Sequence, residues 1–328
     1  MLSENSFKLI DLKNGGIVCY KNLPPLVLAI GNFDGVHLGH RKLISKAVEL
    51  SFEKRSIDDG DRCESGVFCF ATPPADVLLT DPPRHICTLE EKLELFCSLG
   101  VRYAVVAEFE EFCQMTPEDF VRFLKEDCKC TSIVCGFNFR FGRGGVGTPE
   151  ELIEAFSQGA YVIPPVKDEK GNIISSSRIR TLLKNGEVEN AADLLGRPFA
   201  ICSKVIYGKA LGRKLGIPTI NQNFEEKMLV PKCGIYVTRA VFGEKSYMGV
   251  SNVGMRPTVE DKGEINCETH IIDFDGDLYG ERVKIEFLAR LRDEKRFSST
   301  EELREAVAGD IGLARDYYAK IKDQKGYL

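Results

Sequence analysis

Between residues 26 and about 185, short apolar runs alternate with segments of helical periodicity, and this alternation constrains the fold more than any other feature of the chain. The first run, LVLAI, is followed by a segment that places apolar side chains on one helical face, namely those of Leu43, Ile44, Ala47 and Val48. Strands that alternate with helices in this way are typical of a parallel sheet covered by helices.

Two of the expected helices carry a start signal. Thr116 and Thr148 are each followed by proline and, three positions after the threonine, by Asp119 or Glu151. A threonine hydroxyl caps a first helical turn, proline is tolerated at the first helical position, and an acid is favourable at the positive helix end.

After LLGRPF, which ends at residue 199, the pattern changes to longer alternating strands joined by tight glycine or Asp-Gly turns. One helical segment follows, STEELREAVAGDIGLARDYYAKI. The chain has 328 residues, more than the ~250–300 at which single cores usually split. We therefore expect an α/β parallel-sheet domain over residues 1–185, then a small antiparallel β-barrel with a C-terminal helix over residues 186–328, with the boundary within 184–197.

The composition excludes several classes of protein. The net charge is −5 and no long run of one sign occurs, so we expect neither a nucleic-acid nor a membrane partner. No apolar run reaches ~18 residues, and the polar N-terminal segment lacks a signal-peptide core. The twelve cysteines include no C-x-x-C, which favours reduced structural thiols. We expect a cytoplasmic protein, a monomer or a weak homo-oligomer.

The segment GNFDGVHLGH directly follows the first strand. Ligands of open α/β sheets bind beyond the carboxyl ends of the strands, where glycines allow close backbone approach and helix N-termini attract anions. Gly31, Gly35 and Gly39 fit this use, and His37 and His40 can donate hydrogen bonds to charge that develops on a phosphoryl group. The alternative is a pair of capping or surface histidines.

Two other segments of the first half carry polar groups suited to phosphate. In ISSSRIR, a serine hydroxyl and two arginines lie where a strand gives way to a helix (Ser176, Arg178 and Arg180). A serine N-cap with solvent-facing arginines is the alternative. In GFNFRFGRGGVG, Arg140 and Arg143 fit phosphate binding and an ordinary mobile basic loop equally well.

The second half contains YGKALGRKLGIPTIN, a glycine-rich segment with cations that can wrap a triphosphate: Gly208, Lys209, Gly212, Arg213 and Gly216. Thr219 and Asn221 project neutral oxygens from one face of an extended segment, which suits Mg²⁺ ligated mainly by phosphate and water. A plain glycine-rich turn is the alternative, because no Walker A sequence is present. Glu268 lies in an alternating strand, where carboxylates usually face solvent.

Eight segments in order resemble the bacterial bifunctional riboflavin kinase/FAD synthetase family, whose first module is a nucleotidyltransferase with the His-x-Gly-His signature. They are GNFDGVHLGH, TLEEKLELFCSLGV, GFNFRFGRGGVG, ISSSRIRTLL, LGRPF, LGIPTIN, NVGMRPT and ETHIIDFDGDLYG. The resemblance implies that the second domain converts riboflavin and ATP to FMN, and that the first converts FMN and ATP to FAD and pyrophosphate, both with Mg²⁺.

The resemblance also implies roles for single residues. It gives catalysis to His37, His40 and Glu268, the last as the base that accepts the riboflavin 5′-hydroxyl proton. It gives ATP binding in the first module to Gly31, Phe33, Gly39 and Asn138, with the β- and γ-phosphates at Ser176, Arg178 and Arg180. In the second module it gives phosphate binding to the glycine-rich segment and magnesium to Thr219 and Asn221, although Ile220 replaces the family's alanine. His270 is expected only to orient neighbours.

One position departs from the family. After the second strand the family commonly has Phe-x-Pro-His-Pro, whereas this chain has Pro73 in place of the histidine. Proline offers neither a side-chain donor nor an N–H, which predicts a slower adenylyl transfer. A purely structural loop is the alternative. For the whole chain, a kinase with one active module and a flavin-binding regulator without chemistry remain alternatives.

Overall fold

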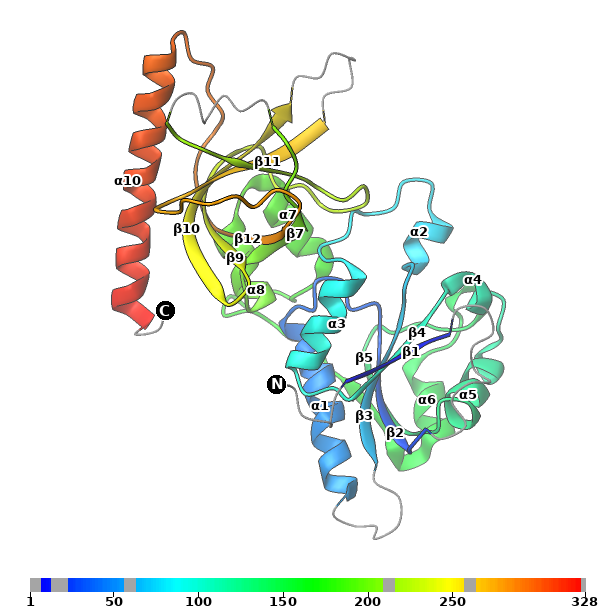
Figure 1. Ribbon diagram of the computed structural model, residues 1–328. Helices are drawn as coiled ribbons and strands as arrows, with labels where there is room; N and C mark the ends of the chain where they lie inside the picture. The colour runs from blue at the N-terminus through cyan, green and yellow to red at the C-terminus, as the bar shows by residue number, and fades with distance from the viewer. Residues whose placement is uncertain (1–6, 13–22, 56–62, 209–215, 257–263, 326–328) are drawn as a thin grey trace. The chain divides into compact units, whose positions relative to one another are not determined.

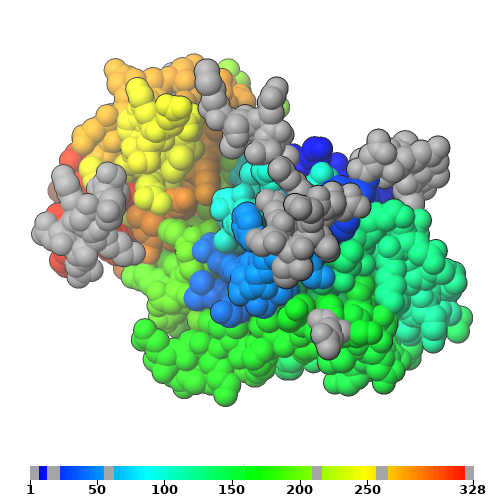
Figure 2. All heavy atoms as spheres, turned by 90° about the horizontal axis from the view of Figure 1, so that it is seen from below, coloured from blue at the N-terminus to red at the C-terminus, as the bar shows by residue number. Residues whose placement is uncertain are grey.

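The structure is a computed structural model that describes residues 7–12, 23–55, 63–208, 216–256 and 264–325 (Figure 1). Figure 2 draws all heavy atoms, with the remaining residues in grey. The chain forms two compact units, one made of Met1–Pro83 and Thr88–Ser175 and the other of Arg84–Cys87 and Ser176–Leu328.

The first unit is a six-stranded sheet with the strand order β1-β4-β3-β2-β5-β6, in which every pair is parallel. The predicted apolar runs form five of these strands, and an edge strand that the pattern did not reveal forms the sixth. The strands are β1 Lys8–Asp11, β2 Leu26–Ile30, β3 Glu64–Phe70, β4 Tyr103–Ala107, β5 Cys130–Gly136 and β6 Ala160–Ile163.

Helices cover both faces of this sheet (Figure 1). Alternate residues of β2 belong to two apolar clusters, because successive side chains of a strand point to opposite faces. Helices α1 and α3 pack in one cluster, and α5 and α6 pack in the other. The helices are α1 Leu38–Arg55, α2 Pro74–Leu78, α3 Leu89–Ser98, α4 Phe109–Phe112, α5 Pro117–Glu126 and α6 Pro149–Phe156, with 3₁₀ turns η2 Arg143–Gly145 and η3 Ser157–Gly159.

The predicted start signals of α5 and α6 are confirmed. The Thr116 hydroxyl accepts a hydrogen bond from the Asp119 backbone N–H at 3.2 Å. At α6 the Glu151 carboxylate accepts from the Thr148 N–H at 2.9 Å. Both contacts satisfy N–H groups that have no partner inside the helix.

The second unit is an antiparallel sheet with the strand order β7-β12-β9-β10-β11-β8. The edge strands β7 and β8 approach each other, because the Gln222 amide donates to the Ser203 carbonyl at 2.7 Å and the Ser203 hydroxyl donates to the Asn223 carbonyl at 3.1 Å. The sheet is therefore a nearly closed barrel, as predicted. Its strands are β7 Phe199–Lys204, β8 Ile220–Asn223, β9 Gly234–Phe242, β10 Lys245–Arg256, β11 Glu264–Ile271 and β12 Arg282–Arg292.

Helix α10, Thr300–Lys325, lies along the barrel, as expected for the C-terminal helix (Figure 1). Ala314 and Tyr318 of α10 are buried in the apolar cluster beneath it, and the Tyr318 hydroxyl donates to the Thr238 carbonyl at 2.9 Å. Two further helices belong to this unit, α7 Ser176–Asn185 and α8 Val188–Leu195. The units thus divide at Ser175/Ser176, whereas the change of pattern placed the boundary within 184–197.

Several cysteines of the strands are packed as apolar residues. Cys69, Cys135 and Cys267 are buried, and burial raises the pKa of the Cys135 and Cys267 thiols to about 11. These thiols therefore stay protonated at neutral pH. None of the helices in the described ranges is long and apolar enough to cross a bilayer.

Candidate active sites

The segment GNFDGVHLGH lies at the switch point of the parallel sheet. From β2 the chain builds β3 and β4 on one side, and then β5 and β6 on the other. The crevice at the carboxyl ends of β2 and β5 is where such sheets bind ligands. The segment leaves the end of β2, and Asn138 follows the end of β5 by two residues.

The loop between β2 and α1 has an unusual backbone. Phe33 and Val36 have φ of +50° and +40°, although neither is glycine, and both are completely buried. Gly35 between them has φ +81°. Left-handed backbone at non-glycine residues is unfavourable and persists only where surrounding contacts enforce it, most often at functional sites.

His37 caps helix α1. Its ring nitrogen Nδ1 accepts a hydrogen bond from the His40 backbone N–H at 3.2 Å, so this ring caps the first turn and still has a second nitrogen. An accepting Nδ1 carries no proton, which leaves Nε2–H as the donor of the neutral ring. Gly39 makes room for this arrangement, because a Cβ at that position would lie 3.0 Å from Cε1 and 3.1 Å from Nδ1 of His37.

The His40 ring is stacked on the His37 ring, with centroids 3.6 Å apart and planes at 15°, and the Phe33 ring contacts it edge-on. Its Nδ1 is buried, and no described residue forms a hydrogen bond with it. Burial, His37 and Lys92 hold the pKa of His40 well below its ordinary value. The side chain is therefore a neutral imidazole with an unused polar atom, an arrangement that suits a hydrogen-bonding ligand.

Lys92 is a site residue that the sequence analysis missed. It is 3% exposed, and its ammonium group lies 3.4 Å from the Asn32 carbonyl oxygen in the same loop. Lys92 belongs to the first turns of helix α3, whose start is fixed by a capping box between Thr88 and Glu91. The available signal was a lysine at the buried face of a helix, four positions before the buried Phe96. A buried cation next to the histidine pair makes this loop favourable for an anionic ligand.

The remaining predicted residues of the first module lie on two segments. Asn138, Arg140 and Arg143 are exposed in the loop after β5, so the ordinary-loop alternative remains for the two arginines. The other three belong to α7 in the second unit: Ser176, Arg178 and Arg180. The Arg180 Nε donates to the Arg84 carbonyl at 2.8 Å, so this guanidinium is engaged within its own unit.

Pro73 occupies the N-cap position of α2, in the loop that leaves β3 next to β2. It provides no side-chain cap, and its carbonyl accepts from the Asp76 N–H at 2.9 Å. The expected neighbourhood is confirmed, because β3 pairs directly with β2 and both carboxyl ends lie at one edge.

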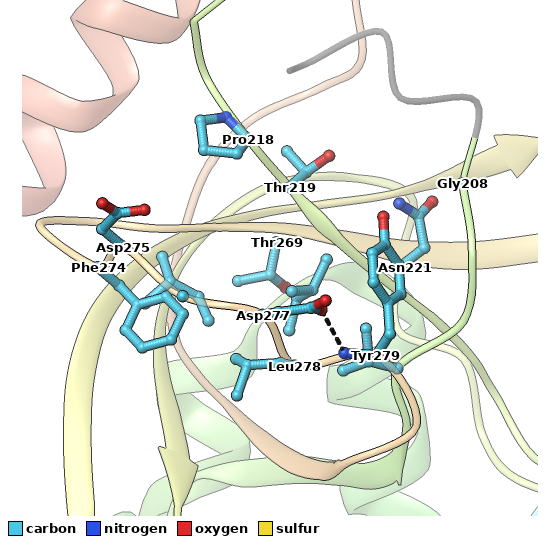
Figure 3. A pocket seen from close by; sticks show the side chains of 14 residues that line it. Gly208, Pro218, Thr219, Asn221, Thr269, Phe274, Asp275, Asp277, Leu278 and Tyr279 are labelled. Atoms are coloured by element: carbon cyan, nitrogen blue, oxygen red, sulfur yellow. Dashed lines mark hydrogen bonds between the residues drawn. The ribbon is translucent and has the colours of Figure 1, made fainter.

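In the barrel unit, a cavity of about 290 Å³ opens among β8, β11 and the loop that follows β11 (Figure 3). Three predicted residues line it, Gly208, Thr219 and Asn221. Lys209, Gly212 and Arg213 lie outside the described residues, and Gly216 adopts φ +76°. The other lining residues are Val205, Pro218, Ile220, Thr269, Ile271, Phe274, Asp275, Gly276, Asp277, Leu278 and Tyr279.

Gly208 is required by the side chain of Asn221. A Cβ on Gly208 would lie 2.4 Å from Nδ2 and 2.8 Å from Cγ of Asn221. The amide of Asn221 therefore packs directly on the Gly208 backbone. Among the described residues, no three His, Cys, Asp or Glu side chains gather as a metal cluster. Neutral oxygens of Thr219 and Asn221 fit a Mg²⁺ that takes its other ligands from phosphate and water.

Strand register places Glu268 in a polar row on the barrel. Glu268 of β11 is directly opposite Asn221 of β8 on one side and Asn252 of β10 on the other. Opposite residues in adjacent strands point to the same face. The Oδ1 of Asn252 is buried, and no described residue donates to it. Asn252 is thus a second candidate site residue that the sequence analysis missed. Its position opposite Glu268 depends on strand register, which the residues around Asn252 do not reveal.

Two further contacts organise the cavity. His270 Nδ1 donates to the Pro218 carbonyl at 2.9 Å, which supports the backbone just before Thr219 and agrees with the orienting role expected for this histidine. In the loop after β11, the Asp277 carboxylate accepts from the Tyr279 N–H at 3.0 Å. The Tyr279 ring stacks on Tyr207 at a centroid distance of 4.0 Å.

The parallel sheet with its candidate site and the barrel with its own cavity are the two modules of a two-domain chain, and the comparisons give the class of each. The family profile described as FAD synthetase matches residues 19–178, and the one described as riboflavin kinase matches residues 195–318. The chain belongs to the bifunctional riboflavin kinase/FMN adenylyltransferase family.

The relatives cover nearly the whole chain. The Bacillus subtilis bifunctional riboflavin kinase/FMN adenylyltransferase is 34% identical over 90% of this chain and 93% of its own length. The Escherichia coli enzyme of the same name is 33% identical over 90% and 94%. A crystal structure of a Streptococcus pneumoniae protein named macrolide-efflux protein superimposes with a TM-score of 0.82 at 30% identity, over 94% of this chain and 98% of that one.

Proposed function

We propose that the chain makes FAD from riboflavin in two ATP-dependent steps, one in each module. The barrel module phosphorylates riboflavin to FMN, and the parallel-sheet module transfers AMP from ATP to FMN. One observation carries the proposal: both family profiles match this single chain, and each covers a candidate phosphate site with its own polar groups. We expect both steps to occur in the cytoplasm, in a monomer or a weak homo-oligomer.

In the kinase step, the riboflavin 5′-oxygen attacks the γ-phosphorus of ATP, and the bond from that phosphorus to the β–γ bridging oxygen breaks to release ADP. Glu268 accepts the hydroxyl proton. Thr219 and Asn221 would hold Mg²⁺, which neutralises charge on the phosphates when bound. We assign the triphosphate to the glycine-rich segment, with Gly208, Lys209, Gly212, Arg213 and Gly216.

In the adenylyl step, an FMN phosphate oxygen attacks the α-phosphorus of ATP, and pyrophosphate leaves. FMN is already ionised, so positioning and charge stabilisation suffice without a strong base. His37 through Nε2–H, together with His40 and Lys92, would stabilise charge on the α-phosphate. We assign the rest of the nucleotide to Gly31, Phe33, Gly39, Asn138, Ser176, Arg178 and Arg180.

The test is a time course of the full chain with riboflavin, ATP and MgCl₂, in which FMN and FAD are separated by chromatography. Appearance of FMN followed by FAD is the expected result. FMN alone would mean that only the kinase module is active. Flavin binding with neither product would mean a regulator without chemistry, and would refute the proposal.

A further inference from the structure

Asn266 of β11 contacts the proposed magnesium ligand directly. Its Nδ2 donates a hydrogen bond to Oδ1 of Asn221 at 3.1 Å. Asn266 and Asn221 are only 4% and 5% exposed. In the register Asn266 is opposite Asn223, so its side chain reaches diagonally to Asn221 on the same face of the barrel.

This contact decides which end of the Asn221 amide faces which way. The oxygen and nitrogen of an amide have nearly the same shape, but only the oxygen can ligate a cation. In the observed arrangement Asn266 presents an N–H, so the atom of Asn221 that meets it is the oxygen. With Asn266 kept as it is, a reversed Asn221 amide would place two N–H groups against each other in a buried position without an acceptor. Oδ1 has two lone pairs, and one remains for a ligand.

Gly208 supplies a second restraint. The Asn221 amide packs against it so closely that a Cβ would lie 2.4 Å from Nδ2 and 3.0 Å from Oδ1 (Figure 3). The backbone is fixed as well, because the Ile206 N–H donates to the Asn221 carbonyl at 2.9 Å. The amide is therefore held in position by backbone on one side and oriented by Asn266 on the other.

We propose that Asn266 is a positioning residue of the kinase module, which orients the Asn221 amide so that Oδ1 is presented to the magnesium–nucleotide. The proposal rests on the assigned function of Asn221 as a metal ligand. Hydrogen-bond partners of metal ligands fix ligand orientation, and their removal commonly lowers metal affinity ~10–100-fold.

The experiment measures binding rather than turnover. ADP is titrated calorimetrically into the full chain at a series of MgCl₂ concentrations and in EDTA. Asn221→Ala identifies the barrel component of the heat, because the first module also binds nucleotide. Asn266→Leu removes the donor at similar volume. Asn223→Leu is the matched control, since Asn223 is an exposed asparagine two residues from Asn221 on the same strand.

We expect Asn266→Leu to raise the Mg²⁺ concentration needed for ADP binding at least ~10-fold, with binding in EDTA unchanged. Asn223→Leu should leave both unchanged. In the Asn221→Ala background, Asn266→Leu should add nothing, because a residue that acts only through its partner has no effect once that partner is gone. If Asn266→Leu does not fold, Asn266→Ser replaces it, with a shortened donor and a smaller shift.

Three results would overturn the inference. Unchanged Mg²⁺ dependence in Asn266→Leu, with a loss in Asn221→Ala, refutes the role of Asn266 and leaves the metal assignment intact. If Asn266→Leu weakens ADP binding equally in EDTA, or weakens it further in the Asn221→Ala background, the role of Asn266 is purely structural. No effect of Asn221→Ala itself refutes the proposed metal ligand, and the inference is refuted with it.

Discussion

Replacement of Gly39 by alanine should separate the stability of the first module from its activity. The new Cβ would lie 3.0 Å from Cε1 and 3.1 Å from Nδ1 of His37, closer than carbon normally approaches a ring. Because the alternative is movement of the helix backbone, we expect the His37 ring to shift by a few tenths of an ångström. That shift disturbs both the cap on α1 and the stack on His40.

The two effects on stability have opposite signs. Weakening of the helix cap costs about 0.5–2 kcal/mol, while alanine in place of glycine in a helix stabilises by about 0.5–1 kcal/mol. The net change in the free energy of unfolding should therefore lie between a loss of about 1.5 kcal/mol and a gain of about 0.5 kcal/mol. Activity has no such compensation. A misplacement of 1 Å can cost ~10²-fold, so a few tenths of an ångström should lower kcat for FAD formation ~10-fold.

The assay measures FAD formed from supplied FMN and, separately, FMN formed from riboflavin, together with urea unfolding. Riboflavin phosphorylation should be unchanged. Gly309→Ala in α10 is the control, because nothing lies within 4 Å of a Cβ there, and it should leave both activities intact. Wild-type FAD formation by folded Gly39→Ala would refute the reasoning that His37 needs its observed position.

His40→Ala should lower FAD formation from FMN by ~10²–10³ while FMN formation persists, as measured by chromatography of both products. Glu268→Gln should give the reverse, no FMN from riboflavin but FAD from supplied FMN, and retained kinase activity would exclude Glu268 as the base. Pro73→His should speed FAD formation without changing the kinase, whereas an unchanged rate with no FMN build-up in the unmodified chain would favour a purely structural loop. The lowered pKa of His40 means that the unfolded state binds more protons below its ordinary value of 6.5, so stability should fall as the pH drops below that value. Urea unfolding at about pH 7.5 and 5.5 should show a larger loss for the unmodified chain than for His40→Asn, and equal losses would contradict the shift.

The fold could be predicted from the sequence to a large extent, because its strands and helices carry periodic signals within short windows. The run LVLAI is β2 without a shift of either end, and the start signals at Thr116 and Thr148 mark real helices. The edge strand β1 was missed because four residues give no usable period. The change of rhythm after α8 likewise indicated a barrel, since alternation and tight turns are local properties of antiparallel strands.

The same distinction between local patterns and long-range contacts applies to the sites. The sequence by itself determined which chemical groups are available and that His37 and His40 lie at the start of a helix that follows a strand. Since residues three apart at a helix start are neighbours, it also indicated that the two rings lie close together. Only the tertiary structure decided that Glu268 is opposite Asn221, that Asn266 orients the Asn221 amide, and that Lys92 lies beneath the histidine loop. These contacts join residues 45 to 60 positions apart, and strand register and helix packing set them through hydrogen bonds and burial that no local pattern encodes.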